Sequence, residues 1–373
     1  TADWESEVFT IDVFEVPSLV RSDANLKYPG YTKLEEKRIE DTVRVSAVEG
    51  TEVTWLCFLN KEVAAAELVA KDGTRIPLRA DTDSPGAMST KLDLQETLRF
   101  KLELLDHAGR KNKYPPELVA RVLPKQPPSL KLTMAGDTSV SPLEELPIAA
   151  EVRDDFGITK VGLSYTFAQT PPQDITLGEK IARGAKTKLE HMIEFEELKA
   201  EPDQLFAYHF WAEDYGPDGE LRRTQSDMYF AEVRPFEEIF REGEPPPGGQ
   251  QQQQQSQNGQ QAEELAELQK EIINATWRVI RDERGKKVSK DFSENVLLLN
   301  ESQADALVQL EELAGQIRDA QSQQYVDAVR ESMQKALIRL AKAGDDADVS
   351  PLNSALLAEQ QAYGGLLKLR ARE

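Results

Sequence analysis

The stretch EPPPGGQQQQQQSQNGQQ, residues 244–261, decides the fold. Nine glutamines, three prolines and three glycines fill these 18 residues. Such a tract buries too little apolar surface to offset the entropy lost on ordering, so the sequence predicts a disordered linker over 243–261. This linker separates a front part patterned like β-strands from a back part patterned like helices, and we expect it to act as a hinge.

In the front part, apolar residues recur at every second position in short runs bounded by Gly, Pro, Asn and Asp. Examples are Val43-Val45-Ala47, Phe100-Leu102-Leu104 and Phe206-Tyr208-Phe210. This is the pattern of half-buried strands, and the short spacing between runs favours an antiparallel sandwich over a parallel sheet with crossover helices. We therefore expect an all-β front part, in which His209 faces solvent or a neighbouring strand.

The front part also contains an internal duplication. The blocks 49–69, 100–106 and 118–124 have counterparts at 145–165, 206–214 and 228–235. A repeat of roughly 100 residues fits two tandem β-sandwiches of the immunoglobulin-like or fibronectin-like type. We predict one sandwich at 1–124, with an extended N-terminal lead-in, and a second at 125–242.

Beyond the glutamines, from 262 to 373, the apolar period becomes helical. Residues such as Leu307, Leu310, Leu313 and Ile317 recur three and four apart and define one apolar face. Both a break near 321–324 and one unbroken helix fit this pattern. Another helix is expected to start at Ser350-Pro351, a cap followed by a first-turn proline. The predicted architecture is an antiparallel helical hairpin or coiled coil.

Composition limits the classes of function. The 373 residues carry a formal net charge of −21, which disfavours nucleic-acid binding through a basic patch. Because Cys57 is the one cysteine, no intrachain disulfide can form. It lies in an apolar run, which predicts a small buried hydrophobic residue. No run of apolar residues is long enough to span a bilayer. Because the chain starts at Thr1, we interpret it as a fragment of a longer protein.

The sharpest chemical hypothesis is a Ca²⁺ site at one end of the second sandwich. In such folds the turn after strand B and the turn before strand G lie at the same end. Four carboxylates on these turns would suit a cation that takes six to eight oxygen ligands: Asp154, Asp155, Asp214 and Asp218. The competing interpretation is that Asp simply favours turns, and no DxDxDG loop is present.

Signals for catalysis are weak. The three histidines, His107, His191 and His209, lie far apart and form no HExxH motif. The sequence lacks GxSxG and the glycine-rich phosphate loops, and Cys57 has no histidine nearby in sequence. Nothing singles out one pair of carboxylates for hydrolysis. The sequence therefore favours a protein without catalytic residues and without an assigned cofactor.

Four apolar positions on the first predicted helix are the candidates for partner binding. They are Leu265, Leu268, Ile272 and Val279, which share one face. Left alone, that face would expose apolar surface, so we expect the helices to pair with each other, with a partner's helices or with a second copy of the chain.

Several segments together resemble a family of large bacterial envelope proteins known only as a domain of unknown function, found in planctomycetes and verrucomicrobia. The resemblance covers roughly 14–313, and its motifs are strand and turn signatures. They are 27–32 (KYPGYT), 48–53 (VEGTEV), 153–158 (RDDFGI), 212–216 (AEDYG) and 235–238 (PFEE).

The resemblance implies an extracytoplasmic, periplasmic protein that takes part in a membrane-associated assembly with protein partners. Family members have membrane-spanning helices ahead of the β-sandwiches and a Gln- and Glu-rich helical region behind them. The resemblance therefore implies anchoring through a segment absent from this chain. It assigns no catalytic residue.

The sequence leads us to expect a non-catalytic envelope scaffold. Two alternatives stay open. One is a carbohydrate-binding or carbohydrate-active module, for which Tyr215 between Asp214 and Asp218 is the local candidate. The other is an adhesion stalk stiffened by Ca²⁺.

Overall fold

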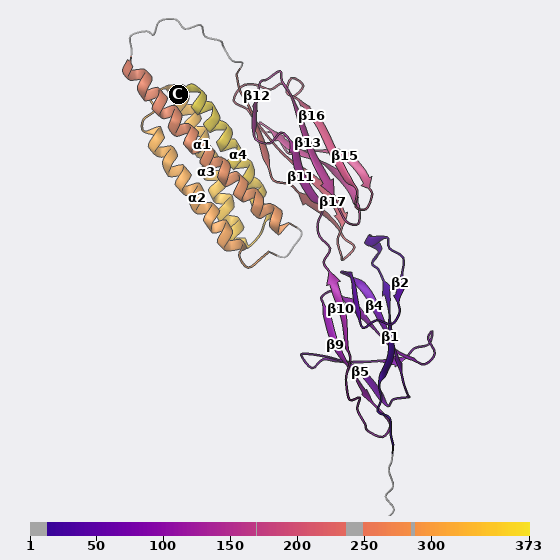
Figure 1. The fold of residues 1–373 in the computed structure, drawn as a ribbon. Helices are drawn as coiled ribbons and strands as arrows, with labels where there is room; N and C mark the ends of the chain where they lie inside the picture. Colours follow the sequence, from indigo (N-terminus) through magenta and orange to yellow (C-terminus); the bar gives the residue numbers. More distant parts are fainter. Residues whose placement is uncertain (1–12, 169, 236–248, 285–287) are drawn as a thin grey trace, which may run out of the picture. The chain divides into compact units, whose positions relative to one another are not determined.

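A computed structural model describes residues 13–168, 170–235, 249–284 and 288–373, with the side chains of 249–256 left out. The chain forms two compact units. The first comprises Thr1–Gln126 together with Tyr215–Glu220, and the second comprises Pro127–Asp214 and Leu221–Glu373 (Figure 1).

The first unit is a β-sandwich of two sheets. In spatial order, one sheet contains β2 (Lys37–Ile39), β1 (Leu19–Lys27), β4 (Thr51–Leu59), β8 (Ala87–Leu94) and β7 (Arg79–Ala80). The other contains β3 (Arg44–Val48), β10 (Glu117–Leu123), β9 (Leu98–Leu105), β5 (Ala65–Ala70) and β6 (Arg75–Pro77). A single-turn 3₁₀ helix, Gly30–Thr32, follows β1. Trp55, fully buried on β4, lies in the core between the sheets.

The second unit begins with another sandwich. Its smaller sheet contains β11 (Ser129–Met134), β13 (Glu145–Arg153) and β16 (Lys186–Glu194). Its larger sheet contains β12 (Thr138–Val140), β19 (Tyr229–Val233), β17 (Leu205–Tyr215), β14 (Ile158–Phe167) and β15 (Gln173–Ile181), with β18 (Leu221–Gln225) also paired to β17. Its core is rich in aromatic side chains, among them Phe195, Phe206 and Phe210.

The strand orders confirm the predicted duplication. The set β1, β4, β8 of the first sandwich corresponds to β11, β13, β16 of the second, and β3, β10, β9, β5, β6 corresponds to β12, β19, β17, β14, β15. In both copies a short strand runs parallel to the last strand of the sandwich, while the other paired strands are antiparallel. Both domains are therefore immunoglobulin-like β-sandwiches, as the period-two pattern predicts.

The helical region is a four-helix bundle. Its helices are α1 (Gly249–Glu283), α2 (Phe292–Ala314), α3 (Ala320–Asp346) and α4 (Ser350–Arg372). Each helix contacts two others, in the order α1, α2, α3, α4 and back to α1. Of the two alternatives for this region, the structure has the break, which lies between Ala314 and Ala320, slightly before the glutamines at 321–324.

The prediction of a disordered linker over 243–261 is wrong from Gly249 onward, where α1 begins. Residues 243–248 lie outside the described residues. Glutamine has a high helix propensity, and a helix that is already nucleated gains one hydrogen bond for each residue added. The tract therefore extends α1 rather than separating it from the sandwiches.

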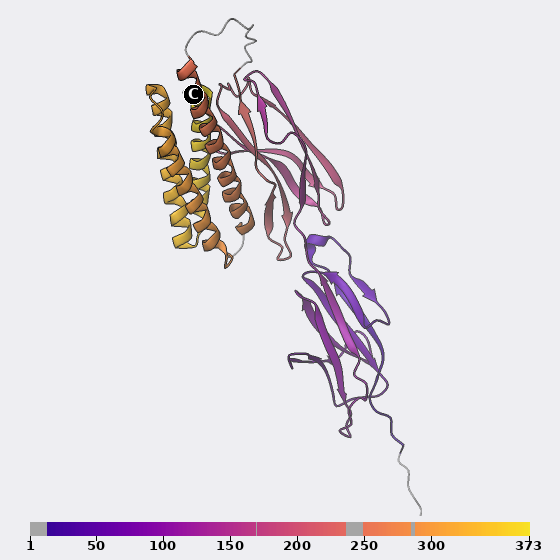
Figure 2. The same cartoon turned by 60° about the vertical axis from the view of Figure 1, so that its left-hand side comes forward.

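The expected hinge between sandwich and helices is not found either. The bundle lies along the larger sheet of the second sandwich (Figures 1 and 2). Leu205, Met228 and Phe230 of the sandwich belong to the same hydrophobic cluster as the helix core. The second sandwich and the bundle thus form one packed body.

Polar pairs interrupt the apolar core of the bundle. Gln269 of α1 and Gln303 of α2 exchange two hydrogen bonds of 2.9 and 3.0 Å between their amide groups. Thr276 of α1 donates to Glu359 of α4 at 3.0 Å. Glu359 is fully buried, and burial raises the pKa of its carboxyl group to about 8.

Within the described residues, none of the helices combines the length and apolarity that a bilayer crossing requires.

Candidate functional site

Strand β17 is buried on both of its faces. All eight residues from Leu205 to Ala212 are buried. Phe206, Tyr208 and Phe210 point into the sandwich core, whereas Leu205 and Ala207, at the alternate positions, pack against the bundle. The equivalent strand of the first sandwich, β9, instead alternates buried and more exposed residues. The second sandwich therefore carries an additional apolar face that the helices cover.

His209 lies in the middle of this contact. Its ring centre is 4.3 Å from that of Trp277 on α1, and its Nε2 atom is 3.0 Å from Nε2 of Gln225 on β18. Burial lowers the pKa of the imidazole to about 3, so the ring is neutral at physiological pH. Of the two expectations for His209, the contact with a neighbouring strand is found, on β18, and exposure to solvent is not, because the helices cover this face of the sheet.

Specific polar contacts fix the bundle on the sheet. Trp277 donates its indole N–H to the carbonyl oxygen of Ser226 at 3.0 Å. The hydroxyl group of Tyr363 on α4 donates to Glu232 of β19 at 2.6 Å, and Arg370 donates to the same carboxylate at 3.1 Å. Burial alone would raise the pKa of Glu232, but these two partners outweigh it and hold the pKa below its ordinary value.

Between sheet and bundle lies a cleft of about 440 Å³, a volume typical of small-ligand sites. The walls come from β14, β15, β17 and β18 on one side and from α1 and α4 on the other. Its ionisable lining residues are Asp174, His209, Arg223 and Arg284, and its apolar ones include Trp277, Met228, Leu356 and Leu357.

Two guanidinium groups, of Arg223 and Arg284, lie near two carboxylates, of Asp174 and Glu213, in and beside this cleft. The Arg223 guanidinium bonds Asp174 at 2.6 Å and Glu213 at 2.8 and 2.9 Å, and it lies 4.0 Å from the centre of the Trp211 ring. Arg284 has no hydrogen bond or ion pair within the described part of the chain. Burial and repulsion from Arg223 lower the pKa of Arg284.

A further cleft of about 370 Å³ opens along the same sheet–bundle contact. It is lined by Asp203, Tyr325, Gly364 and Lys368, among others. Gln360 contributes to both clefts. Its side chain donates to the sulfur of Met228 at 3.3 Å and accepts from the hydroxyl group of Thr166 at 3.3 Å. Gln360 therefore lies between the two clefts.

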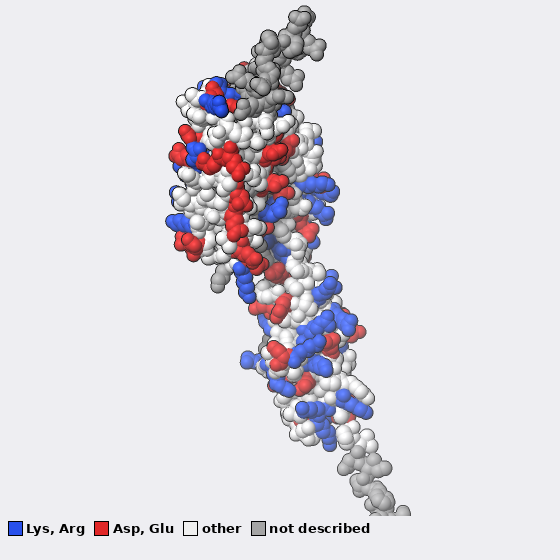
Figure 3. Space-filling view, turned by 90° about the vertical axis from the view of Figure 1, so that its left-hand side faces the viewer, with Lys and Arg blue, Asp and Glu red and all other residues white. Residues whose placement is uncertain are grey.

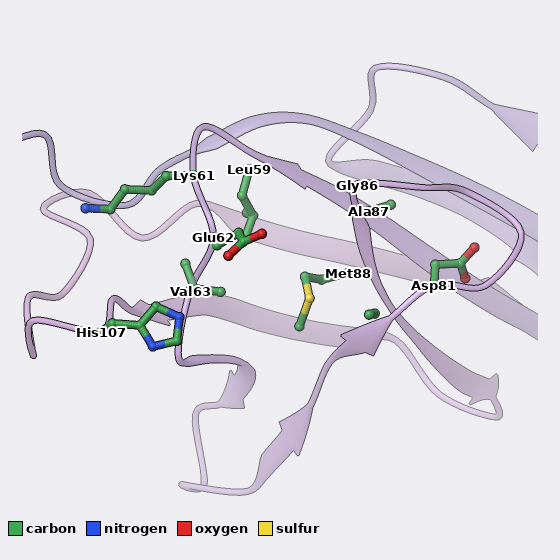
Figure 4. Close-up of a pocket in the computed structure, with 10 residues that line it drawn as sticks. Leu59, Lys61, Glu62, Val63, Asp81, Gly86, Ala87, Met88 and His107 are labelled. Atoms are coloured by element: carbon green, nitrogen blue, oxygen red, sulfur yellow. The ribbon is translucent and has the colours of Figure 1, made fainter.

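The first unit has a shallower cleft of about 470 Å³ at one end of its sandwich (Figure 4). Lys61, Glu62, Asp81 and His107 line it together with Met88. The Lys61 ammonium is already paired with Asp106 at 2.8 Å. Lys61 also donates to the carbonyl oxygen of Glu15 at 2.7 Å, and Asp81 accepts the backbone N–H groups of Asp83 and Ser84 at 3.1 and 2.7 Å.

The four carboxylates predicted to bind Ca²⁺ are not brought together. Arg222 holds Asp214 through two hydrogen bonds of 2.8 and 2.9 Å. Asp154 accepts the backbone N–H of Phe156, Asp218 accepts that of Glu220, and Asp155 is exposed. Across the described ranges no three His, Cys, Asp or Glu side chains are close enough to hold a metal ion. Turn formation accounts for these residues.

The four apolar positions predicted to bind a partner lie inside the chain's own bundle. Leu265 and Ile272 are 2% and 3% exposed, and Leu268 and Val279 pack against the same cluster. The premise that this face would be exposed is therefore incorrect, because α2, α4 and the larger sheet of the second sandwich cover it.

The local arrangement offers little to a carbohydrate-active site around Tyr215. Its ring is 48% exposed, but the neighbouring Asp214 is 1% exposed and is neutralised by Arg222. Cys57 is fully buried, as the sequence predicts, and burial raises the pKa of its thiol to about 12. Such a thiol does not ionise at neutral pH.

Sequence reasoning missed the sheet–bundle cleft, although one signal for it was present. The run from Leu205 to Ala212 is apolar or aromatic at every position except His209. An antiparallel strand with one solvated face alternates, so an unbroken run indicates that both faces are covered.

No family model matches the chain, and no curated protein resembles it in sequence. Solved structures resemble it in part. A protein of unknown function from Porphyromonas gingivalis W83 is 17% identical, with 51% of this chain and 94% of that chain covered and a TM-score of 0.20. A two-domain fibronectin type III segment from chicken tenascin is 13% identical, with 51% and 96% covered and a TM-score of 0.19.

A D1–D4 ectodomain fragment of ICAM-5 is also similar, with 15% identity, 58% of this chain and 52% of that chain covered, and a TM-score of 0.24. The chain's own strand orders and packing describe a pair of immunoglobulin-like sandwiches, the second of which packs against a helical bundle.

Proposed function

We propose that the chain is a non-catalytic structural and interaction protein of an extracytoplasmic assembly in the bacterial envelope, where it binds protein partners. The observation that supports the proposal is that three side chains with reactive groups are withdrawn from solvent in the described part of the chain. The Cys57 thiol and the Glu359 carboxyl group are fully buried, and the His209 imidazole is buried in its neutral form. Catalysis needs such groups within reach of a substrate.

The surface best suited to a partner is the exposed side of α2 and α3. Four large apolar side chains there are between 58% and 66% exposed: Leu297, Leu298, Val308 and Ile338. We call these four residues the outer apolar set. In the same bundle, acidic side chains form a line over the helices (Figure 3). Exposed carboxylates on α2 include Glu301, Asp305 and Glu312.

This combination favours a partner with an apolar anchor flanked by basic residues. Apolar contacts would supply most of the affinity, and the acidic line would speed and orient the encounter. The outer apolar set therefore replaces Leu265 and its three companions as the proposed partner surface.

The proposal is tested by capture from envelope extracts with the full chain. We expect specific proteins to bind the wild type, and the double change Leu298→Asp and Ile338→Asp to reduce their recovery at least tenfold. Met192→Asp is the matched control, because Met192 is 44% exposed on β16 of the sandwich. Equal recovery by the double variant would remove the outer apolar set as the binding surface. If the wild-type chain repeatedly captures no protein from the extract, the proposed interaction role is contradicted.

A further inference from the structure

Three residues of the outer apolar set lie along the exposed side of the contact between α2 and α3. Leu297 and Val308 are 11 residues apart, which is about three helical turns, so they lie on one line along α2. Each stands three positions before a side chain that bonds α3, namely Asn300 and Glu311. Ile338 comes from α3 and is 66% exposed. We call Leu297, Val308 and Ile338 the outer seam.

Opposite charges flank the outer seam. On α2, the exposed residues Glu301 and Asp305 have no ion pair within the described ranges. On α3, the exposed residues Lys335 and Arg339 are cationic, and Lys335 also pairs with Glu331 of its own helix at 2.7 Å. A complementary partner therefore has an apolar strip with cations on the side that meets α2 and acids on the side that meets α3.

Contacts between α2 and α3 fix the register of these charges. The two helices run in opposite directions, since higher residue numbers on α2 pair with lower numbers on α3. Asn300 donates to the carbonyl oxygen of Leu337 at 2.9 Å. Glu301 is therefore level with about residue 337, midway between Lys335 and Arg339 along the helix axis. The acids of α2 and the cations of α3 lie at the same height.

A second copy of the chain offers the complementary surface. In a twofold dimer, the same surface of each copy contacts that of the other. With the twofold axis parallel to the helices, α2 of one copy lies against α3 of the other, so Glu301 meets Lys335 and Arg339 and the two outer seams meet. With the axis across the helices, α2 meets α2 and acids face acids, which is unfavourable. The charges therefore select the first arrangement.

The apolar side chains also fit one another in this arrangement. By the same register, Leu297 is level with Ala341 of α3, which is small and exposed. Leu297 of each copy therefore faces Ala341 and the neighbouring Ile338 of the other. Large side chains set against small ones pack without a void.

Like charges limit how far the contact extends. At one end, Asp345 and Asp346 of α3 would meet Glu294 of the other copy. At the other end, Glu312 of α2 would meet Asp327. The contact is therefore confined to 297–308 and 330–342. We expect it to bury less than the roughly 800 Å² per partner of a standard complex, so the dimer should form only at micromolar or higher concentration.

We propose that the outer seam and its charged flanks join two copies of this chain into a twofold dimer, with α2 of each copy against α3 of the other. Ile338 between Lys335 and Arg339 is itself an apolar anchor flanked by basic residues. The proposal rests on the proposed function, because it names a second copy of the chain as the partner of the outer apolar set.

The first test is sedimentation velocity of the full chain at concentrations from about 5 to 200 µM. We expect the dimer fraction to rise with concentration and to fall when salt is raised from about 50 to 500 mM, because exposed ion pairs are screened. Ile338→Asp should weaken the dimer at least tenfold. Met192→Asp, on an exposed position of β16, is the matched control and should dimerise like the wild type.

The second test reverses the charges on one helix at a time. One variant carries Glu301→Lys and Asp305→Lys, and the other carries Lys335→Glu and Arg339→Glu. Each variant alone should dimerise at least tenfold more weakly than the wild type, because α2 and α3 then carry the same charge. An equimolar mixture of the two should form a heterodimer, since the basic α2 of the first meets the acidic α3 of the second.

Three results would overturn the proposal: a monomer at every concentration, an unchanged dimer in Ile338→Asp, and a mixture that associates no better than either charge variant alone. A monomeric wild type that still captures envelope proteins through the outer apolar set would remove the second copy as partner and leave the proposed function standing. Dimers that depend on the outer seam, with no capture from the extract, would instead contradict partners other than the chain itself.

Discussion

Glu359 is a carboxyl group held without solvent contact in the middle of a helical bundle. One of its oxygens accepts from Thr276, and the other has no partner among the described residues. Its pKa of about 8 in the folded chain compares with an ordinary value of 4.5. Between these values the unfolded chain has released the proton and the folded chain has kept it. Stability must therefore fall as pH rises from about 4.5 to 8.

We expect Glu359→Gln to flatten this dependence, because the amide does not titrate. The wild-type loss over the full window amounts to roughly 4 to 5 kcal/mol, at about 1.4 kcal/mol for each pKa unit. Urea unfolding followed by helical circular dichroism at pH 5, 7 and 9 measures it. Glu301→Gln on the exposed side of α2 serves as control and should keep the wild-type slope. Parallel slopes for all three proteins would show that Glu359 is ionised in the folded state.

Two adjacent glycines in α4, Gly364 and Gly365, should respond in opposite ways to replacement by alanine. A Cβ atom added to Gly364 meets nothing within 4 Å, whereas one added to Gly365 would lie 2.5 Å from Cγ2 of Val329 on α3. We expect Gly364→Ala to stabilise the bundle by about 0.5–1 kcal/mol through helix propensity. Gly365→Ala should destabilise it by about 1–3 kcal/mol through overpacking. Thermal unfolding of the two variants compares them directly.

A double variant can show whether the loss of stability in Gly365→Ala comes from the contact with Val329 or from a general effect on the helix. Val329→Ala removes the atom that the new methyl group would meet, so the double variant with Gly365→Ala should recover part of the loss. If the two changes are simply additive, close packing of α3 on α4 is not the reason for the glycine.

At the level of elements, the sequence predicted the kinds of structure better than their boundaries. Period-two runs and the repeat of blocks near 49–69 and 145–165 indicated two sandwiches, because strand periodicity and turn residues are local properties. The glutamine tract was misread, since disorder was inferred from composition while helix extension depends on the neighbouring α1. The buried pair Gln269 and Gln303 was not predicted, because amide groups that satisfy each other have no sequence signature.

The candidate site was less predictable than the fold. Asp154 and Asp214 were placed on suitable turns, but their bonding to Phe156 and Arg222 is a matter of side-chain geometry. The cleft around His209 requires knowing which sheet face the helices cover. The unbroken apolar run of β17 shows that a face is covered, yet it does not say by what.

The packing of the bundle against the second sandwich should stabilise the helices as well as the sheet. Phe230 of β19 is 1% exposed, and its ring lies 6.1 Å from that of Tyr363 on α4. Phe230→Ala should cost about 3–5 kcal/mol by opening a cavity in the contact. Because α1 and α4 rest on this strand, we expect faster amide hydrogen exchange in both helices, measured by mass spectrometry.

Phe210→Ala is the comparison, because Phe210 lies on the same sheet but points into the sandwich core. It should raise exchange mainly in the strands. If Phe230→Ala accelerates exchange in β19 alone, the helices hold together without the sheet.

The two faces of β17 have a consequence for the solubility of the second sandwich. The outer surface of β9 in the first sandwich is compatible with water, whereas β17 has Leu205, Ala207 and Trp211 on the corresponding side. If the helices were removed, this apolar side of the sheet would face water and favour aggregation. We therefore expect the second sandwich to stay soluble only together with the bundle.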